Sequence, residues 1–234
     1  FWNESLKFEG DMNTAGKPLK FTYFISGVYF LTYQNKNLYT GPNETQGFSL
    51  IGFATEEDLA QRIEKINEAV ANGNEIASHA NGHFNGLHWS ESQWIDELNL
   101  FNNLVFHAQE NNPQISLPKI NLNEKDIVGF RAPELAKNQD THKAMKALGY
   151  LYDASGIDMG KKWPEKDATG LWMLPLASIN IPGLGETISI DYSIFSLESG
   201  AKDTVKADSP MWQFLRKNTL ESYENYFNRN YNGN

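Results

Sequence analysis

Two histidines four residues apart, His79 and His83, carry the clearest chemistry that this sequence offers. They follow a short apolar segment, residues 75–78, in a loop that Asn81 and Gly82 keep irregular. Neutral imidazole nitrogens are good zinc ligands, and two of them at this spacing can reach one ion. A third ligand, expected to be a carboxylate, would leave one coordination position open for water, as catalysis requires. Histidines at this spacing also occur on ordinary helices without a metal, but Gly82 argues against a continuous helix here.

The surrounding pattern predicts strands that alternate with helices. Helices are expected over residues 2–14, 55–73, about 90–105 and about 138–148, with a last helix that starts at Ser209-Pro210. Strands are expected over residues 21–26, 75–78, 127–130, 150–153, 171–174 and 188–192, and a long polar loop over residues 33–53. Alternation of this kind indicates an α/β fold with a parallel sheet or barrel.

Three polar side chains lie where predicted strands end: His79, Arg131 and Asp153. In a parallel barrel the loops at the carboxyl ends of the strands carry function, so we expect these side chains to share a site. Arg131, followed by Pro133, is also compatible with a plain strand-end turn that makes a surface salt bridge.

Composition excludes several classes of protein. The 234 residues carry a formal net charge of −9, so a nucleic-acid partner or an anionic membrane surface is disfavoured. No apolar run is long enough to span a bilayer. The absence of cysteine excludes thiol catalysis, disulfides and iron–sulfur clusters, so any metal must use His, Asp or Glu.

Four segments occur in a fixed order along the chain: Phe21-Thr-Tyr-Phe-Ile-Ser-Gly27, His79-x-x-x-His83, Arg131-Ala-Pro133-Glu134 and Gly149-Tyr-Leu-Tyr-Asp-Ala-Ser155. This order resembles the polysaccharide deacetylase family, also called NodB-homology or carbohydrate esterase family 4. Its patterns are a "TFF-x-x-G" strand, an "H-[ST]-x-x-H" metal motif and an "R-x-P-[YF]" motif. The segment from Trp89 to Glu97, and Ile190-Asp-Tyr192, resemble the chitin-deacetylase-like branch. The resemblance covers most of the chain.

The resemblance implies a distorted, incomplete (β/α) barrel in a single domain over residues 1–234. It also implies removal of N-acetyl groups from amino sugars with the help of zinc or another divalent metal. His79 and His83 would be metal ligands. Arg131 would orient a catalytic carboxylate through a charge-assisted hydrogen bond, and the backbone N–H of Glu134 would help to hold the oxyanion.

The sequence departs from the family pattern in two ways. Ala80 replaces the usual Ser or Thr of the metal motif, and Glu134 replaces the usual aromatic residue. The family's "T-F-D-D" motif, with the general base and the third metal ligand, would precede the first helix, and its general acid would follow the last. We therefore expect the sequence to belong to a longer protein. The alternative is a non-catalytic glycan-binding module on the same scaffold.

The resemblance also implies a glycan partner, an N-acetylglucosamine polymer such as peptidoglycan or a chitin-like chain. Four side chains are expected to bind it: Asp153, His88, Trp89 and Trp172. An indole face stacks on a sugar ring, although tryptophans are as often plain core residues. Asp153 could instead accept hydrogen bonds from a neighbouring loop. A polymeric substrate of this kind further implies a secreted or periplasmic protein.

Overall fold

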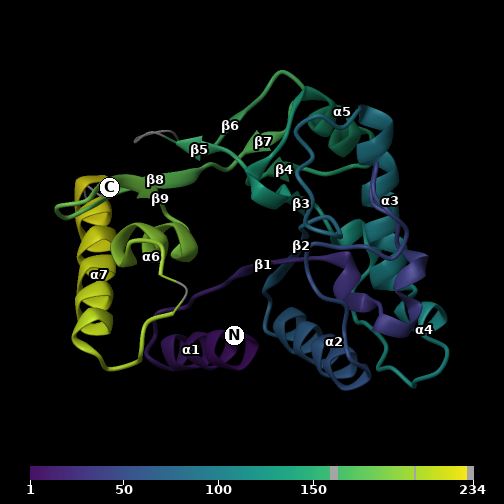
Figure 1. Cartoon of the computed structure of the whole chain (residues 1–234), viewed down its shortest axis with the longest axis horizontal. Coiled ribbons are helices and arrows are strands. Elements are labelled where there is room, and N and C mark those ends of the chain that lie inside the picture. The colour runs from purple at the N-terminus through teal and green to yellow at the C-terminus, as the bar shows by residue number, and fades with distance from the viewer. Residues whose placement is uncertain (159–162, 203, 231–234) are drawn as a thin grey trace. The chain divides into compact units, whose positions relative to one another are not determined.

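A computed structural model describes residues 1–158, 163–202 and 204–230 of the chain. The chain divides into two compact units (Figure 1). The first contains Phe1–Ala154 and Lys166–Trp172, and the second contains Ser155–Glu165 and Met173–Asn234. The single domain expected from the sequence stays a prediction, since two compact units can belong to one domain.

A parallel sheet forms the centre of the first unit. Its strands β1 (Thr22–Ile25), β2 (Glu75–Ser78), β3 (Gly129–Phe130) and β4 (Tyr152–Asp153) run parallel in this order. The sheet continues with β7 (Trp172–Met173) and β6 (Glu165–Lys166). The predicted α/β class with a parallel sheet is therefore confirmed. Ser78 pairs with Phe130, and Phe130 pairs with Asp153, so the carboxyl ends of β2, β3 and β4 lie level.

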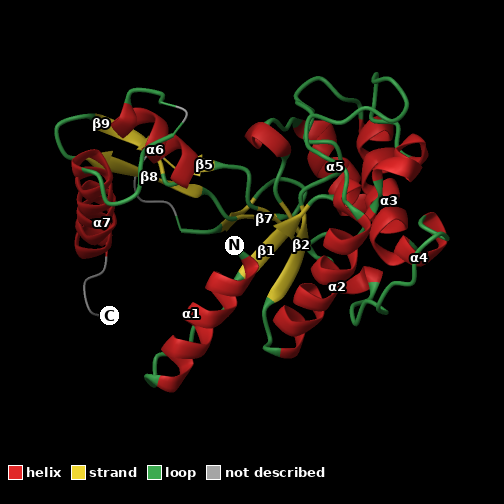
Figure 2. Ribbon diagram, turned by 60° about the horizontal axis from the view of Figure 1, so that its bottom comes forward, coloured by secondary structure: helices red, strands yellow, loops and turns green. Residues whose placement is uncertain are grey.

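Helices of the first unit gather beside this sheet, with α2, α3 and α5 on one side of β1 and β2 (Figure 2). The helices are α1 (Trp2–Thr14), α2 (Glu56–Ala71), α3 (Glu91–Phe106), α4 (Ala108–Asn111) and α5 (Gln139–Ala147). Short 3₁₀ turns are η1 (Gly27–Phe30), η2 (Tyr33–Leu38), η3 (Glu124–Asp126) and η4 (Pro133–Leu135). The region expected as one long loop therefore opens with a 3₁₀ turn, η2.

Local signals set the helix ends. The Thr55 side chain accepts a hydrogen bond from the Asp58 N–H, and Ser90 and Gln93 form a complete capping box at the start of α3. Apolar residues at helical spacing then fill the core. From α2 the buried residues are Leu59, Ile63, Ile66 and Ala69, and from α3 they include Trp94, Leu98, Phe101 and Val105. Full burial of one large apolar side chain contributes about 1.5–3 kcal/mol, so these two faces fix both helices against the sheet.

The second unit contains a small sheet and two helices. The sheet has the order β5 (Ile157–Asp158), β8 (Leu176–Ile181) and β9 (Gly185–Ile188), with β8 and β9 antiparallel. Helices α6 (Asp191–Ser199) and α7 (Pro210–Asn230) follow, and Pro210 occupies the first position of α7 as predicted.

The predicted strand over residues 188–192 is wrong. Strand β9 ends at Ile188, and Asp191 is the first residue of α6. The Asp191 carboxylate accepts a hydrogen bond from the Tyr192 N–H at the helix start, where a negative charge is favourable. The isoleucines at positions 188 and 190 favoured a strand, but the chain turns after Ile188 and enters helix α6 at Asp191.

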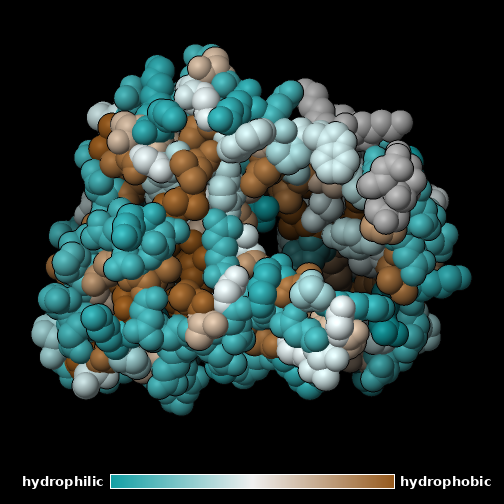
Figure 3. All heavy atoms as spheres, turned by 180° about the vertical axis from the view of Figure 1, so that it is seen from behind, coloured by the Kyte–Doolittle hydropathy of each residue, from teal (hydrophilic) through white to brown (hydrophobic). Residues whose placement is uncertain are grey.

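Hydrophilic residues cover much of the face shown in Figure 3, with smaller hydrophobic groups between them. Among the described residues, no helix combines the length and the apolar character needed to cross a bilayer.

Candidate metal centre

The structure brings the two predicted metal ligands together. The ring centroids of His79 and His83 lie 5.1 Å apart with an angle of 71° between the ring planes. Both side chains are partly buried, and both belong to the loop that follows β2. Two imidazoles at this separation can present nitrogens to one ion.

A backbone contact fixes the state of the His79 ring. Its Nδ1 lies 2.7 Å from the carbonyl oxygen of Arg131. A carbonyl only accepts, so Nδ1 carries the hydrogen and Nε2 keeps its lone pair. Burial lowers the pKa of His79 to about 4, and the charges of His83 and Arg131 add to this effect. The ring is therefore neutral near pH 7, which is the form that binds a metal.

The loop between the two rings has an unusual backbone. Ala80 and His83 have positive φ angles of 53° and 61°. Left-handed conformations are uncommon for residues other than glycine and persist only where the surroundings enforce them. A Cβ on Gly82 would approach the Tyr39 hydroxyl oxygen to 2.5 Å, so only glycine fits there. The loop is not helical, as the glycine predicted.

Two buried side chains hold this loop from outside it. The Glu97 carboxylate accepts a hydrogen bond from the Asn81 N–H (3.0 Å), and the Tyr39 hydroxyl accepts one from the Gly82 N–H (3.0 Å). Sequence reasoning gave neither side chain a role. Tyr39 lay in the expected polar loop, and Glu97 stood out only as a member of a resembling segment. The one signal in the sequence was the acidic residue Glu97 on the apolar face of the predicted helix, next to Leu98 and three positions after Trp94.

Arg131 lies beside His79. Its Nε donates to the Ala154 carbonyl (3.1 Å), and its guanidinium lies 4.4 Å from the centre of the Phe24 ring. Burial lowers the pKa of Arg131. Arg131 and His79 both line a cavity of about 620 Å³ alongside β1. The proposed pairing of Arg131 with a catalytic carboxylate stays a prediction.

Glu134 is exposed and has a positive φ of 54°. Its carboxylate accepts a hydrogen bond from the Asn85 side chain (2.8 Å). Asn85 belongs to the segment that follows His83, so the carboxylate is tied to the neighbourhood of the metal loop. The use of the Glu134 N–H as an oxyanion donor stays a prediction.

Asp153 lies at the predicted strand end but in a closed environment. Its side chain is fully buried, with Lys137 Nζ at 2.6 Å and His142 Nε2 at 3.0 Å. The other nitrogen of His142 lies 2.8 Å from Asp167. The structure therefore corrects the expectation that Asp153 binds a glycan hydroxyl, because its carboxylate is sealed by side chains that pair with it. The alternative expectation, that Asp153 bonds to a neighbouring segment, agrees with its contacts to Lys137 and His142.

The three expected sugar-stacking residues differ in exposure. Trp89 is 6% exposed and packs at a ring distance of 4.7 Å against Trp94, so it is a core residue. This burial corrects the expected contact with sugar. His88 is exposed, and Trp172 is 44% exposed with Lys166 Nζ 5.1 Å from its ring centre. For His88 and Trp172 a role in glycan binding stays a prediction.

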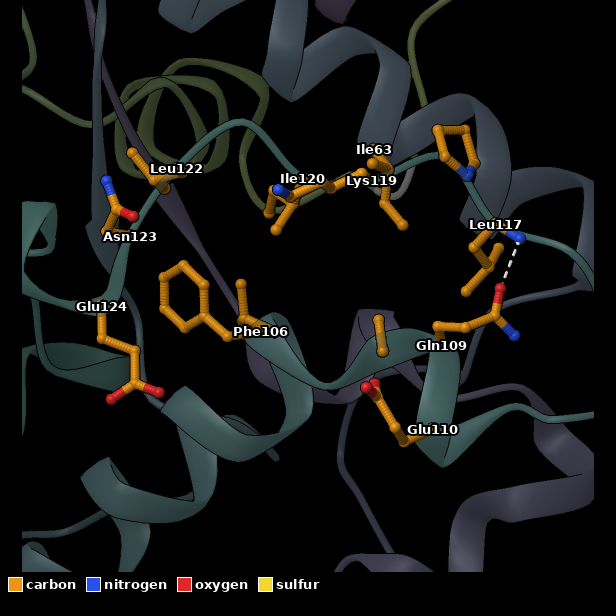
Figure 4. Close-up of a pocket in the computed structure, with 13 residues that line it drawn as sticks. Ile63, Phe106, Gln109, Glu110, Leu117, Lys119, Ile120, Leu122, Asn123 and Glu124 are labelled. Atoms are coloured by element: carbon orange, nitrogen blue, oxygen red, sulfur yellow. Dashed lines mark hydrogen bonds between the residues drawn. The ribbon is translucent and has the colours of Figure 1, made fainter.

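A second hollow lies elsewhere in the first unit. It measures about 480 Å³ and is lined by residues of α2, α3, α4 and the segment 117–124 (Figure 4). Gln109 crosses its rim and accepts a hydrogen bond from the Leu117 N–H (2.9 Å). None of the residues that line this hollow is a histidine or an arginine, so the predicted site residues lie outside it.

Imidazole nitrogens are good zinc ligands, so His79 and His83 fit the predicted metal chemically. Within the described parts of the chain, no cluster of three or more His, Asp or Glu side chains is arranged to hold an ion. The carboxylate expected as the third ligand therefore stays a prediction.

Comparison with known proteins gives distant structural matches. No family model matches the sequence, and no curated protein matches it. A candidate polysaccharide deacetylase from Mycobacterium smegmatis has 21% identity and a TM-score of 0.45, over 75% of this chain and 44% of that one. The PuuE allantoinase has 16% identity and a TM-score of 0.41, over 72% and 48%. A family 4 carbohydrate esterase from Streptomyces lividans has 15% identity and a TM-score of 0.32, over 58% and 60%.

A candidate polysaccharide deacetylase and a family 4 carbohydrate esterase are thus among the solved structures that this chain resembles. In all three cases the match covers less than two thirds of the other protein's length. The names also cover different activities, and at these TM-scores the similarity does not assign a substrate.

Proposed function

We propose that this chain belongs to a metal-dependent hydrolase that removes N-acetyl groups from an N-acetylglucosamine-containing polysaccharide, either peptidoglycan or a chitin-like chain. The observation that carries the proposal is the pair of imidazoles after β2. The ring centroids of His79 and His83 lie 5.1 Å apart, so both rings can reach one metal ion. Such a substrate would place the protein outside the cytoplasm. The order of the motifs in the sequence supports the same proposal.

Zinc bound here would supply a Lewis acid for the acetamide carbonyl and a water made more acidic. His79 offers Nε2 to the ion, since its Nδ1–H is committed to the Arg131 carbonyl. The Arg131 side chain lines the same cavity as His79 and can orient an acidic group there. The Glu134 N–H is the proposed donor to the oxygen that gains charge in the reaction.

The test is acetate release. Purified protein is loaded with zinc and incubated with chitooligosaccharides and with peptidoglycan, and free acetate is measured enzymatically. Because the resembling family places its general base and general acid outside this sequence, the assay uses protein that includes those segments. Acetate from this protein and none from its His79→Ala variant supports the proposal. Glycan binding by that protein without acetate release would overturn the proposal in favour of a binding module.

A further inference from the structure

We propose that Glu97 and Tyr39 are positioning residues for the metal loop, and that they set its metal affinity without touching metal or substrate. The inference rests on the proposed metal site. Hydrogen bonds join the two side chains to the backbone between His79 and His83, and this contact defines the loop geometry.

Three successive N–H groups of the loop end on side-chain oxygens. The Ala80 N–H donates to the Ser78 hydroxyl (3.2 Å), the Asn81 N–H to Glu97 and the Gly82 N–H to the Tyr39 hydroxyl. The Tyr39 hydroxyl in turn donates to the Glu97 carboxylate (3.2 Å). Glu97 and Tyr39 thus form one chain of hydrogen bonds that reaches both central amides of the loop.

Helix α3 holds the loop at a second point. The Asn81 side-chain amide donates to the backbone carbonyl of Glu97 (2.7 Å), so the backbone and the side chain of Asn81 are both fixed to one helix residue. The Asn81 side-chain oxygen faces Gly27, where a Cβ would come within 1.9 Å. The Gly27 N–H donates to the Ala80 carbonyl (2.9 Å), which fixes the other side of the loop.

Burial separates Glu97 and Tyr39 from any substrate. Glu97 is 2% exposed and Tyr39 is 0% exposed. A buried carboxylate costs free energy unless it is well hydrogen-bonded, and here its bonds go to the metal loop. The loop needs this support, because Ala80 and His83 hold left-handed conformations that residues other than glycine avoid. Without the two amide bonds, the imidazoles would lose their shared orientation.

The first test measures metal affinity. Zinc binding to the whole chain is followed by competition with a chromophoric chelator, and the metal environment is followed by cobalt absorption. Outer-sphere partners of metal ligands typically change affinity by about 10–100-fold, so we expect a loss in this range for Tyr39→Phe and Glu97→Leu, with altered cobalt bands. Glu97→Gln keeps an acceptor oxygen and should recover most of the affinity.

A matched control is Glu9→Leu. Glu9 is 1% exposed and is bound by Lys20 and Asn74, and Asn74 directly precedes β2, at the end opposite the histidines. Its loss should lower stability and leave zinc affinity and cobalt bands unchanged. Zinc affinity within twofold of wild type in folded Tyr39→Phe and Glu97→Leu would overturn the inference.

The second test needs no metal, so it separates this inference from the proposed function. Hydrogen exchange of the Asn81 and Gly82 amides is measured in the metal-free protein. We expect strong protection in the wild type and at least tenfold faster exchange at Gly82 in Tyr39→Phe, with amides of β1 unaffected. Unchanged exchange at Gly82 would overturn the inference. Absence of zinc binding by the wild type would instead count against the proposed function.

Discussion

The ends of β2 and β4 lie level in one sheet, yet the polar side chains at the two ends differ in whether partners within the protein occupy them. After β2, His79 donates a hydrogen bond from Nδ1 to the Arg131 carbonyl, and its Nε2 remains able to bind a ligand. The ring lines a cavity of about 620 Å³. At the end of β4, Asp153 is fully buried and paired with Lys137 and His142. Position at a strand end is thus not enough for function, because internal partners can consume the side chain.

The partners also differ in kind. The His79 loop is held through its backbone: the Asn81 and Gly82 N–H groups donate to Glu97 and Tyr39. Neither bond uses an imidazole, so both rings stay available. Asp153 is held through its own carboxylate by two nitrogen donors. The first arrangement prepares a side chain for an external ligand, and the second stabilises the fold.

The largest expected effect comes from Asp153→Ala. Removal of this carboxylate leaves Lys137 and His142 without their common partner, and breaking a buried ion pair typically costs about 3–5 kcal/mol. Urea denaturation measures the free energy of unfolding. A loss below about 1 kcal/mol would mean that the β4 end is not the closed, structural region described above.

Trp89→Ala tests the core position of that indole. Truncation of a buried aromatic residue typically costs about 3–5 kcal/mol, and Trp89 packs against the fully buried Trp94. Thermal unfolding followed by calorimetry should show the loss. If stability were unchanged while glycan affinity fell, Trp89 would belong to a sugar site after all.

The pH dependence of stability tests the support of the metal loop. Burial raises the pKa of Glu97 from 4.5 to about 7. Between these two values the folded protein keeps a proton that the unfolded chain loses, so this group makes stability fall as pH rises from about 4.5 to about 7. The whole change is on the order of 3 kcal/mol.

His79 acts in the opposite direction, since its lowered pKa makes stability rise with pH between about 4 and 6.5. The difference in unfolding free energy between the wild type and Glu97→Gln, measured in urea across pH 4–8, isolates the Glu97 contribution. A difference that does not vary with pH would show that Glu97 titrates normally.

The smallest expected effect is that of Trp172→Ala on stability. Its side chain is 44% exposed, so unfolding free energy should change by no more than about 0.5 kcal/mol. Affinity for chitooligosaccharides, measured by titration calorimetry, should fall if the indole stacks on sugar. Unchanged affinity would remove Trp172 from the proposed glycan surface.

Local signals were enough to predict the longer helices and the strands β1 to β4 of the first unit, but not β5, β8, β9 and α6 of the second. Thr55 and Ser90 begin helices through bonds to residues only three positions away, so the sequence contains the information directly. The histidine loop was recognisable for the same reason. The support from Tyr39 and Glu97 was not, because these residues are 58 positions apart and meet only in the folded chain.

The same limit explains the errors at Asp153 and Trp89. The sequence placed Asp153 at the end of a strand and Trp89 shortly after the metal loop, as the structure has them. Whether these side chains are buried depends on what packs against them. Lys137 and His142 reach Asp153 from the segment that contains α5, and Trp94 covers Trp89 from α3. Strand-end position is visible in a sequence, whereas closure by another element is not.

X-ray absorption at the zinc edge tests the shared metal site of His79 and His83 most directly. In the zinc-loaded wild-type chain we expect two imidazole nitrogens at about 2.0–2.1 Å, and one in each of His79→Ala and His83→Ala. A spectrum without imidazole scattering, or one that neither substitution changes, would contradict the assignment.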